Sequence, residues 1–156
     1  MSEQFESVKK EFFSRLGETC YMVLATSDND YPMASTMTCL VFDDAIWMQT
    51  DKKFPKYTQM LHNPRVALVK NATQIEGTAE FCGHPADRAN RRFAELLKKH
   101  HPGSFEMYAG VPTEVVIKVT PTKAVDWLYE AGDNRIYHYD FVKEEVEIQY
   151  YENSKK

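Results

Sequence analysis

The chain has 156 residues, of which 43% are hydrophobic and 27% are charged. This length and composition predict one water-soluble globular domain, residues 1–156, that is large enough to bury its own core. A net charge of −4 argues against a general nucleic-acid-binding protein, and no apolar run reaches the roughly 18–20 residues that span a bilayer.

The first half of the chain predicts a helix followed by an antiparallel meander. Phe5, Val8, Phe12 and Leu16 recur at helical spacing, so we expect a helix over residues 3–16 that ends at Gly17. Apolar runs separated by short Asp- and Asn-containing turns then predict three strands, at residues 19–27, 33–42 and 45–50. The first of these strands is almost entirely apolar, which predicts that both of its faces are covered.

A second helix and two more strands are expected next. Pro55 suits the first turn of a short helix over residues 54–61, and Asn63-Pro64 ends it. Strands at residues 66–69 and 73–82 follow. Gly77 interrupts the second of them, which indicates a β-bulge or a close approach of another backbone.

The remainder of the chain is again expected to form helices followed by strands. An amphipathic helix is expected over residues 85–100, with most of its arginines and lysines on a solvated face, and a helical turn over 104–109. Further strands are expected at 114–120, 124–129, 133–139 and 146–151. Segregated strands and helices indicate an α+β fold, and the closely spaced strands favour a closed or nearly closed barrel of mostly antiparallel strands with flanking helices.

Three cysteines, Cys20, Cys39 and Cys82, lie in apolar strand-like runs without CxxC spacing. Buried free thiols of this kind are typical of a reducing compartment. The charged N-terminal segment lacks the apolar core of a signal peptide, so we expect a cytoplasmic protein.

The motifs of several enzyme classes are absent from the sequence. There is no hydrolase nucleophile elbow, no Walker loop and no dinucleotide-binding glycine pattern. The histidines are not at metal-ligand spacing relative to the cysteines, so no metal site is expected. No acid–base residue stands out as catalytic.

One segment has the composition of an anion site. The strand at 45–50 ends in Thr50, and Lys52, Lys53 and Lys56 follow at the start of the short helix. Hydroxyl and ammonium groups beside a helix start are suited to holding a phosphate. On spacing alone, a solvated lysine loop is an equally good interpretation.

The sequence around this segment resembles the pyridoxamine 5′-phosphate oxidase-like family, which has an FMN-binding split β-barrel. The resemblance rests on the spacing from Thr50 to Lys56, on the runs MLHNPRVALV and QIEGTAEF that follow, and on the Tyr31-Pro32 turn. Each piece is weak by itself, but their order and spacing together are fairly specific.

The resemblance implies a homodimer with two FMN molecules at the subunit interface. In family terms, Thr50 and Lys56 would hold the phosphate, with Lys52 or Lys53 assisting. Gln74 would bind the ring edge, and Trp127 would cover the ring from the partner subunit. Residues of the second strand would run beside the isoalloxazine ring, namely Ser35, Thr36, Met37 and Thr38.

Departures from the oxidase itself concern its cationic contacts. Ser35 and Leu40 stand where the oxidase has Arg and Lys, and Phe54-Pro55 replaces a Ser-Arg pair. The oxidase's C-terminal substrate segment is replaced by the run RIYHY at residues 135–139. The resemblance therefore implies a flavin-binding relative with a substrate other than pyridoxamine phosphate.

Three functions remain open at this point. The first is an FMN-dependent oxidoreductase acting on a small molecule, with electrons from NAD(P)H or directly from the substrate. The second is a flavin-binding carrier or sensor without turnover. The third keeps the barrel for haem, with His84 or the His100-His101 pair as axial ligand, or for a deazaflavin.

Overall fold

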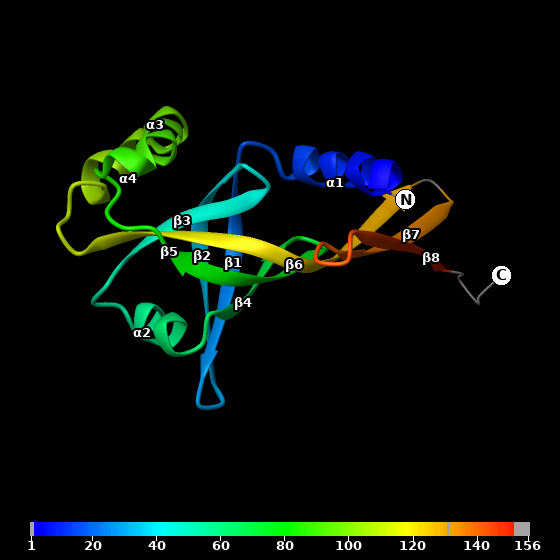
Figure 1. Cartoon of the computed structure of the whole chain (residues 1–156), viewed down its shortest axis with the longest axis horizontal. Helices are drawn as coiled ribbons and strands as arrows, with labels where there is room; N and C mark the ends of the chain where they lie inside the picture. The colour runs from blue at the N-terminus through cyan, green and yellow to red at the C-terminus, as the bar shows by residue number, and fades with distance from the viewer. Residues whose placement is uncertain (1, 131, 152–156) are drawn as a thin grey trace.

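Residues 2–130 and 132–151 are described by the structure, a computed structural model. Across these residues, eight strands form one sheet in the order β3-β2-β1-β4-β5-β6-β7-β8 (Figure 1). Their bounds are β1 Thr19–Asp28, β2 Tyr31–Phe42, β3 Ala45–Asp51, β4 Arg65–Lys70, β5 Thr73–Phe81, β6 Glu114–Glu130, β7 Asp133–Asp140 and β8 Glu145–Tyr151.

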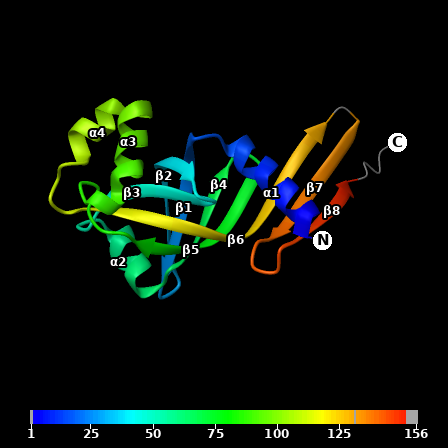
Figure 2. The same cartoon turned by 45° about the horizontal axis from the view of Figure 1, so that its top comes forward.

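Pairing between β3 and β6 closes the first six strands of this order into an antiparallel barrel. The first part of β6 pairs with β3 and β5, and its last part pairs with β7. The hairpin β7–β8 therefore extends the sheet beyond the barrel, away from α3 and α4 (Figure 2). The predicted α+β split barrel with flanking helices is confirmed.

Four α-helices and one 3-10 turn accompany the described strands. They are α1 Ser2–Leu16, α2 Pro55–His62, η1 Arg88–Asn90, α3 Arg91–His100 and α4 Pro102–Tyr108. In α1, Phe12 packs against Tyr139 with ring centroids 5.0 Å apart, and Phe5 contacts Phe141, so α1 covers one face of the β6–β8 extension. None of these helices is long and apolar enough to cross a membrane.

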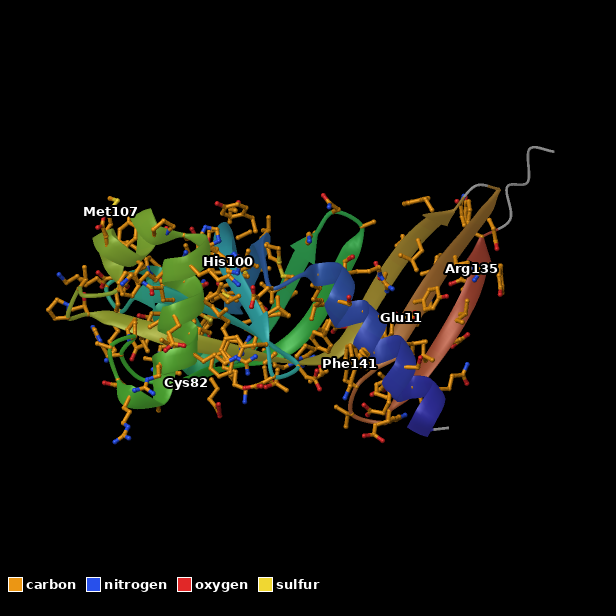
Figure 3. The ribbon with its side chains drawn as sticks, turned by 90° about the horizontal axis from the view of Figure 1, so that it is seen from above. Glu11, Cys82, His100, Met107, Arg135 and Phe141 are labelled. Atoms are coloured by element: carbon orange, nitrogen blue, oxygen red, sulfur yellow. The ribbon has the colours of Figure 1, made fainter. Side chains whose placement is uncertain are left out.

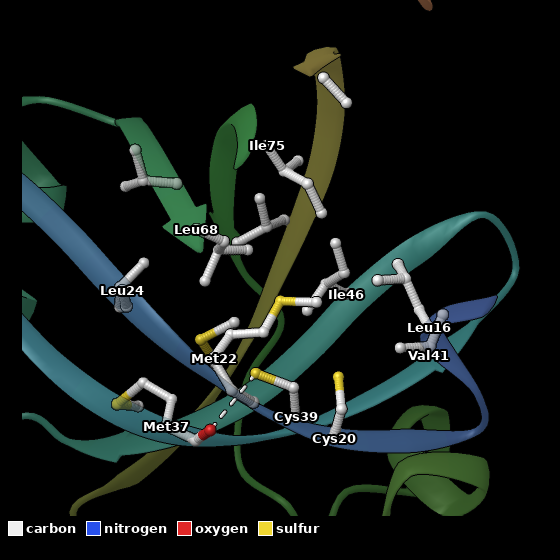
Figure 4. Packing of buried hydrophobic residues seen from close by; sticks show 14 of the residues in the cluster. Leu16, Cys20, Met22, Leu24, Met37, Cys39, Val41, Ile46, Leu68 and Ile75 are labelled. Atoms are coloured by element: carbon white, nitrogen blue, oxygen red, sulfur yellow. Dashed lines mark hydrogen bonds between the residues drawn. The ribbon is translucent and has the colours of Figure 1, made fainter. Parts of the chain in front are cut away.

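The main core fills the barrel and continues under α1. Its largest fully buried side chains include Met22, Leu24, Ile46, Met48 and Leu68. In Figure 4, Met22, Leu24, Ile46 and Leu68 converge from neighbouring strands. Cys20 and Cys39 are buried in this cluster as free thiols, as expected, whereas the free thiol Cys82 is only partly buried. Burial raises the pKa of Cys39 to about 12, so its thiol is un-ionised at neutral pH.

The sequence placed one helix over residues 85–100, and its start was wrong. The α-helix begins at Arg91, because Asn90 donates from Nδ2 to the carbonyls of Cys82 and His84 and fixes the preceding turn. Asp87 Oδ2 also accepts the backbone N–H of His84 at 3.0 Å. These side-chain contacts satisfy backbone groups that a longer helix would have used.

The two strands predicted at 114–120 and 124–129 are one continuous strand in the structure, β6. Pro121 lies within it, opposite Gly77, where the register between β5 and β6 shifts. A Cβ on Gly77 would lie 2.7 Å from Val119 Cγ1 and 2.8 Å from the Thr120 carbonyl oxygen. The bulge and the close backbone approach predicted at Gly77 are therefore confirmed, and the bulge lets a strand accept Pro121.

Candidate functional site

Lys56 lies on α2, which side-chain hydrogen bonds hold against the β1–β2 hairpin. Gln59 is buried, accepts from the Thr26 hydroxyl and donates to the Tyr31 carbonyl at 3.0 Å. Asn63 Nδ2 donates to the Ser27 carbonyl at 2.8 Å. The middle and the C-terminal end of α2 are thus fixed relative to the hairpin, and these contacts help to hold Lys56 over β2.

The Lys56 ammonium is half-buried and touches only neutral groups. Its Nζ donates to Ser35 Oγ at 2.8 Å and lies 3.4 Å from Met37 Sδ. Among the side chains of residues 4–129 and 132–151, no carboxylate forms an ion pair with it. Burial lowers the pKa of Lys56 below its ordinary value. A partly desolvated cation without a counter-ion is costly, and a bound anion would relieve that cost.

The other residues of the expected phosphate cluster lie apart from these contacts. Thr50 is buried near the end of β3, on the same side as the core residues of that strand. Lys52 and Lys53 are exposed in the turn that follows. Their backbone amides are already used: Lys52 N–H donates to the Thr113 carbonyl and Lys53 N–H to Asp51 Oδ1, each at 2.9 Å. An anion at this turn would therefore be bound by the ammonium groups of the two lysines and not by their backbone N–H groups.

The four second-strand candidates divide between two faces of β2. Ser35 and Met37 turn toward Lys56, and Met37 is buried. Thr36 and Thr38 point to the outer side of the barrel, where Thr36 is exposed. This division follows from the two-residue period of a strand.

A continuous outward-facing row runs from Thr36 across five strands. Thr36 pairs with Val23, Val23 with Val69, Val69 with Gln74, and Gln74 with Val125. Directly paired residues share one face of a sheet, so these side chains lie side by side. We call this set the outer row.

The surface around the outer row is apolar and bare in a single chain. Val23 and Val69 are each 40% exposed, and Tyr21 beside them is 61% exposed. A second row, Ala34–Ala25–Ala67, runs parallel to the first and carries only methyl groups. The sequence alone did not indicate that Val23, Val69 and the three alanines belong to a site. Their alternation within each strand was visible, but the cross-strand register that aligns them was not.

Gln74 and Trp127 line one cleft at the end of the outer row. The cleft has a volume of about 340 Å³, and Val69, Tyr129 and other uncharged residues form the rest of its wall. Trp127 stacks on Tyr129 with ring centroids 6.2 Å apart. The structure therefore brings Gln74 and Trp127 of one chain together.

The segments that depart from the oxidase lack free cations facing this site. Leu40 is fully buried in a second core with Phe93 and Val116. Arg135 forms an ion pair with Asp133 at 2.8 Å and lies over the Tyr150 ring. Because Trp127 pairs with Ile136, the neighbouring Arg135 points to the opposite face of the sheet.

The histidines proposed for haem are occupied by hydrogen bonds. His84 Nε2 contacts the Val111 carbonyl at 2.9 Å, and its Nδ1 accepts the Ala86 N–H at 3.0 Å. His100 Nε2 contacts Glu18, and His101 Nε2 contacts Thr19 Oγ1. Iron ligation by His84 would break one of its two contacts.

Solved structures support the fold. A pyridoxamine 5′-phosphate oxidase-type protein of Listeria innocua is 23% identical, with a TM-score of 0.59 over 75% of this chain and 95% of its own. The heme storage protein HutZ of Vibrio cholerae is 11% identical, with a TM-score of 0.59 over 75% and 89% of the two chains. An F420 reductase is 20% identical, with a TM-score of 0.54 over 71% and 93%.

No curated protein sequence matches the chain. The family model described as pyridoxamine 5′-phosphate oxidase, however, matches residues 8–128, from α1 nearly to the end of β6. That span contains Lys56, the outer row and Trp127. This chain belongs to the pyridoxamine 5′-phosphate oxidase family.

Proposed function

We propose that this protein is an FMN-binding flavoprotein, and that it is an oxidoreductase acting on a small molecule other than pyridoxamine phosphate. The observation that carries the proposal is the half-buried Lys56 ammonium, which contacts Ser35 and Met37 but no carboxylate of the described chain. A phosphate monoester supplies the missing negative charge.

The same proposal places the isoalloxazine ring against the outer face of the barrel. Small side chains at Ala25, Ala34 and Ala67 let a planar ring approach the sheet, and the Gln74 amide offers hydrogen bonds to the ring edge. FMN, when bound, supplies the electron-transfer chemistry. The chain holds the cofactor, orients its ring and keeps water from one side of it.

A homodimer formed through this outer face is part of the proposal. The strand β1 is apolar on both sides, yet one chain buries only the side that carries Met22 and Leu24. The exposed side, with Tyr21 and Val23, is the kind of bare apolar surface that marks an interaction site. A second copy covering it would enclose two FMN molecules, and the cleft of each chain would then present both Gln74 and Trp127 to one ring.

One observation favours FMN over haem, and another favours FMN over a deazaflavin. The histidines that haem would need are held in hydrogen bonds, as described above for His84. The half-buried cation at Lys56 also fits one compact phosphate, whereas a long acidic cofactor tail would favour an extended basic groove. The free thiols Cys20, Cys39 and Cys82 are in keeping with a cytoplasmic location.

The experiment that tests this function compares FMN with riboflavin, which has the same ring but no phosphate. Quenching of flavin fluorescence during titration with protein gives both affinities. We expect one FMN per chain, with riboflavin bound at least about tenfold more weakly, since a charge-assisted contact is lost. Equal affinities would contradict a phosphate site, and absence of FMN binding would contradict the function. Turnover with NADH or NADPH then separates an oxidoreductase from a carrier.

A further inference from the structure

A separate cavity lies between α3 and α4, at the end of the molecule opposite the β7–β8 hairpin. Figure 3 shows this arrangement, with Met107 on α4 at one end and Arg135 on β7 at the other. The cavity has a volume of about 570 Å³, within the range of small-molecule sites. It shares no lining residue with the cleft of Gln74 and Trp127.

The floor of this cavity is apolar. Phe105, Ala94 and Ala109 line it, together with Pro85 and Gly110. Phe105 and Ala109 belong to the second core, which fixes the floor in place beneath α3. Such a surface favours the hydrocarbon part of a ligand over water.

Three cations line the cavity: Arg88 of η1, and Arg91 and Lys98 of α3. Lys98 Nζ lies 5.7 Å from the centre of the Phe105 ring, so its charge is held directly over the apolar floor. None of the three cations forms an ion pair with a side chain of residues 4–129 or 132–151. The adjacent Arg92 and Lys99, by contrast, pair with Asp43 and Glu18.

Three carboxylates, Asp87, Glu95 and Glu106, also line the cavity and equal the cations in number, but none of them forms an ion pair with a cation of the lining. The carboxylate of Asp87 is engaged by the His84 N–H at 3.0 Å. Glu95 and Glu106 are exposed, and neither forms an ion pair with the three cations. Unpaired cations above an apolar floor match a molecule with an apolar body and one anionic head.

We propose that the α3–α4 cavity binds a free small amphipathic anion, such as an aromatic or aliphatic carboxylate or sulfonate, with its body on Phe105 and its head at Arg91 and Lys98. This site is distinct from the proposed FMN site and does not depend on it.

Anilinonaphthalene sulfonate is a suitable probe, because it has aromatic rings and one sulfonate and fluoresces in apolar surroundings. N-phenyl-1-naphthylamine has the same rings without the charge. We expect saturable binding of the sulfonate to the wild-type protein. In the double variant Arg91→Gln/Lys98→Gln, its affinity should fall about tenfold while that of the uncharged probe changes less than about twofold.

The matched control is Arg92→Gln/Lys99→Gln, which removes the same charges from the neighbouring positions of the same helix. We expect the sulfonate affinity of this control to stay within about twofold of wild type. A variant that fills the cavity, Ala94→Trp, should abolish binding while its melting transition shows that it is folded.

Three results would overturn the proposal. Equal weakening in the two double variants would show general charge attraction rather than a site. Absence of saturable binding to the wild type would show that the cavity takes no such ligand. Displacement of the probe by FMN would place it on the outer face instead, without affecting the proposed flavin function.

Discussion

Replacement of Lys56 by methionine is the substitution that tests the proposed phosphate site most sharply. Methionine keeps much of the length of the side chain and its contact with Met37, but it removes the ammonium that donates to Ser35 at 2.8 Å. Loss of one charge-assisted contact costs about 1–3 kcal/mol, which corresponds to a roughly 5- to 150-fold weaker affinity for FMN.

The same substitution should leave the fold intact. Lys56 has no ion pair to lose within the described chain, and burial already disfavours its charge. We therefore expect the unfolding free energy of the cofactor-free protein to stay within about 1 kcal/mol of wild type in urea titrations. Lys10→Met, at an exposed position of α1 outside the expected phosphate cluster, is the control for general charge effects.

The affinity of the wild-type protein for FMN should also depend on pH in a defined direction. Burial lowers the pKa of Lys56 from its ordinary value of 10.5, so the free protein loses this proton earlier as pH rises. FMN affinity should fall on the alkaline side, starting below pH 10.5. The reasoning is refuted if Lys56→Met binds FMN as tightly as wild type, or if Lys10→Met weakens binding equally.

Three further predictions concern the fold and the assembly. Gly77→Ala should destabilise the protein by about 1–3 kcal/mol in urea unfolding, because the new Cβ would lie 2.7 Å from Val119 Cγ1; Gly103→Ala, which meets nothing within 4 Å, should not. Glu114→Gln should raise stability by about 1 kcal/mol at pH 8 but not near pH 4. Burial raises the pKa of the Glu114 carboxyl above its ordinary value of 4.5, so ionisation of this carboxyl destabilises the fold as the pH rises. One of its carboxylate oxygens also has no hydrogen-bond partner among the described residues. An equal effect of Glu114→Gln at both pH values would contradict this explanation. Val23→Glu should convert a dimer into a monomer in sedimentation experiments, because it places a charge on the bare outer face; an unchanged particle mass would move the interface elsewhere.

Local sequence patterns were sufficient for the element types and for the barrel. The helical spacing of Phe5, Phe12 and Leu16 and the short polar turns between apolar runs depend only on near neighbours, and the structure has the corresponding helix and meander. The predictions from sequence were wrong where contacts outside the local pattern determine the structure. The start of α3 is set by Asn90 bonding to Cys82 and His84, which no helical pattern reveals.

The candidate site could be predicted less completely from the sequence, because it depends on contacts between residues far apart in the chain. The contact of Lys56 with Ser35 joins residues 21 positions apart, and it depends on how α2 is anchored to the β1–β2 hairpin. The outer row depends on the register of four strand pairs, and a shift of one residue would turn each side chain to the other face. The apolar character of both faces of β1 was visible in the sequence; which face a single chain leaves bare was not.

The central claim, that FMN binds at an interface between two copies of this chain, is tested most directly by sedimentation of the reconstituted protein monitored at flavin and protein absorbance together. The account predicts that flavin absorbance sediments with a dimer at a ratio of one FMN per chain. Protein that sediments without flavin absorbance, or a monomer that carries FMN, would contradict it.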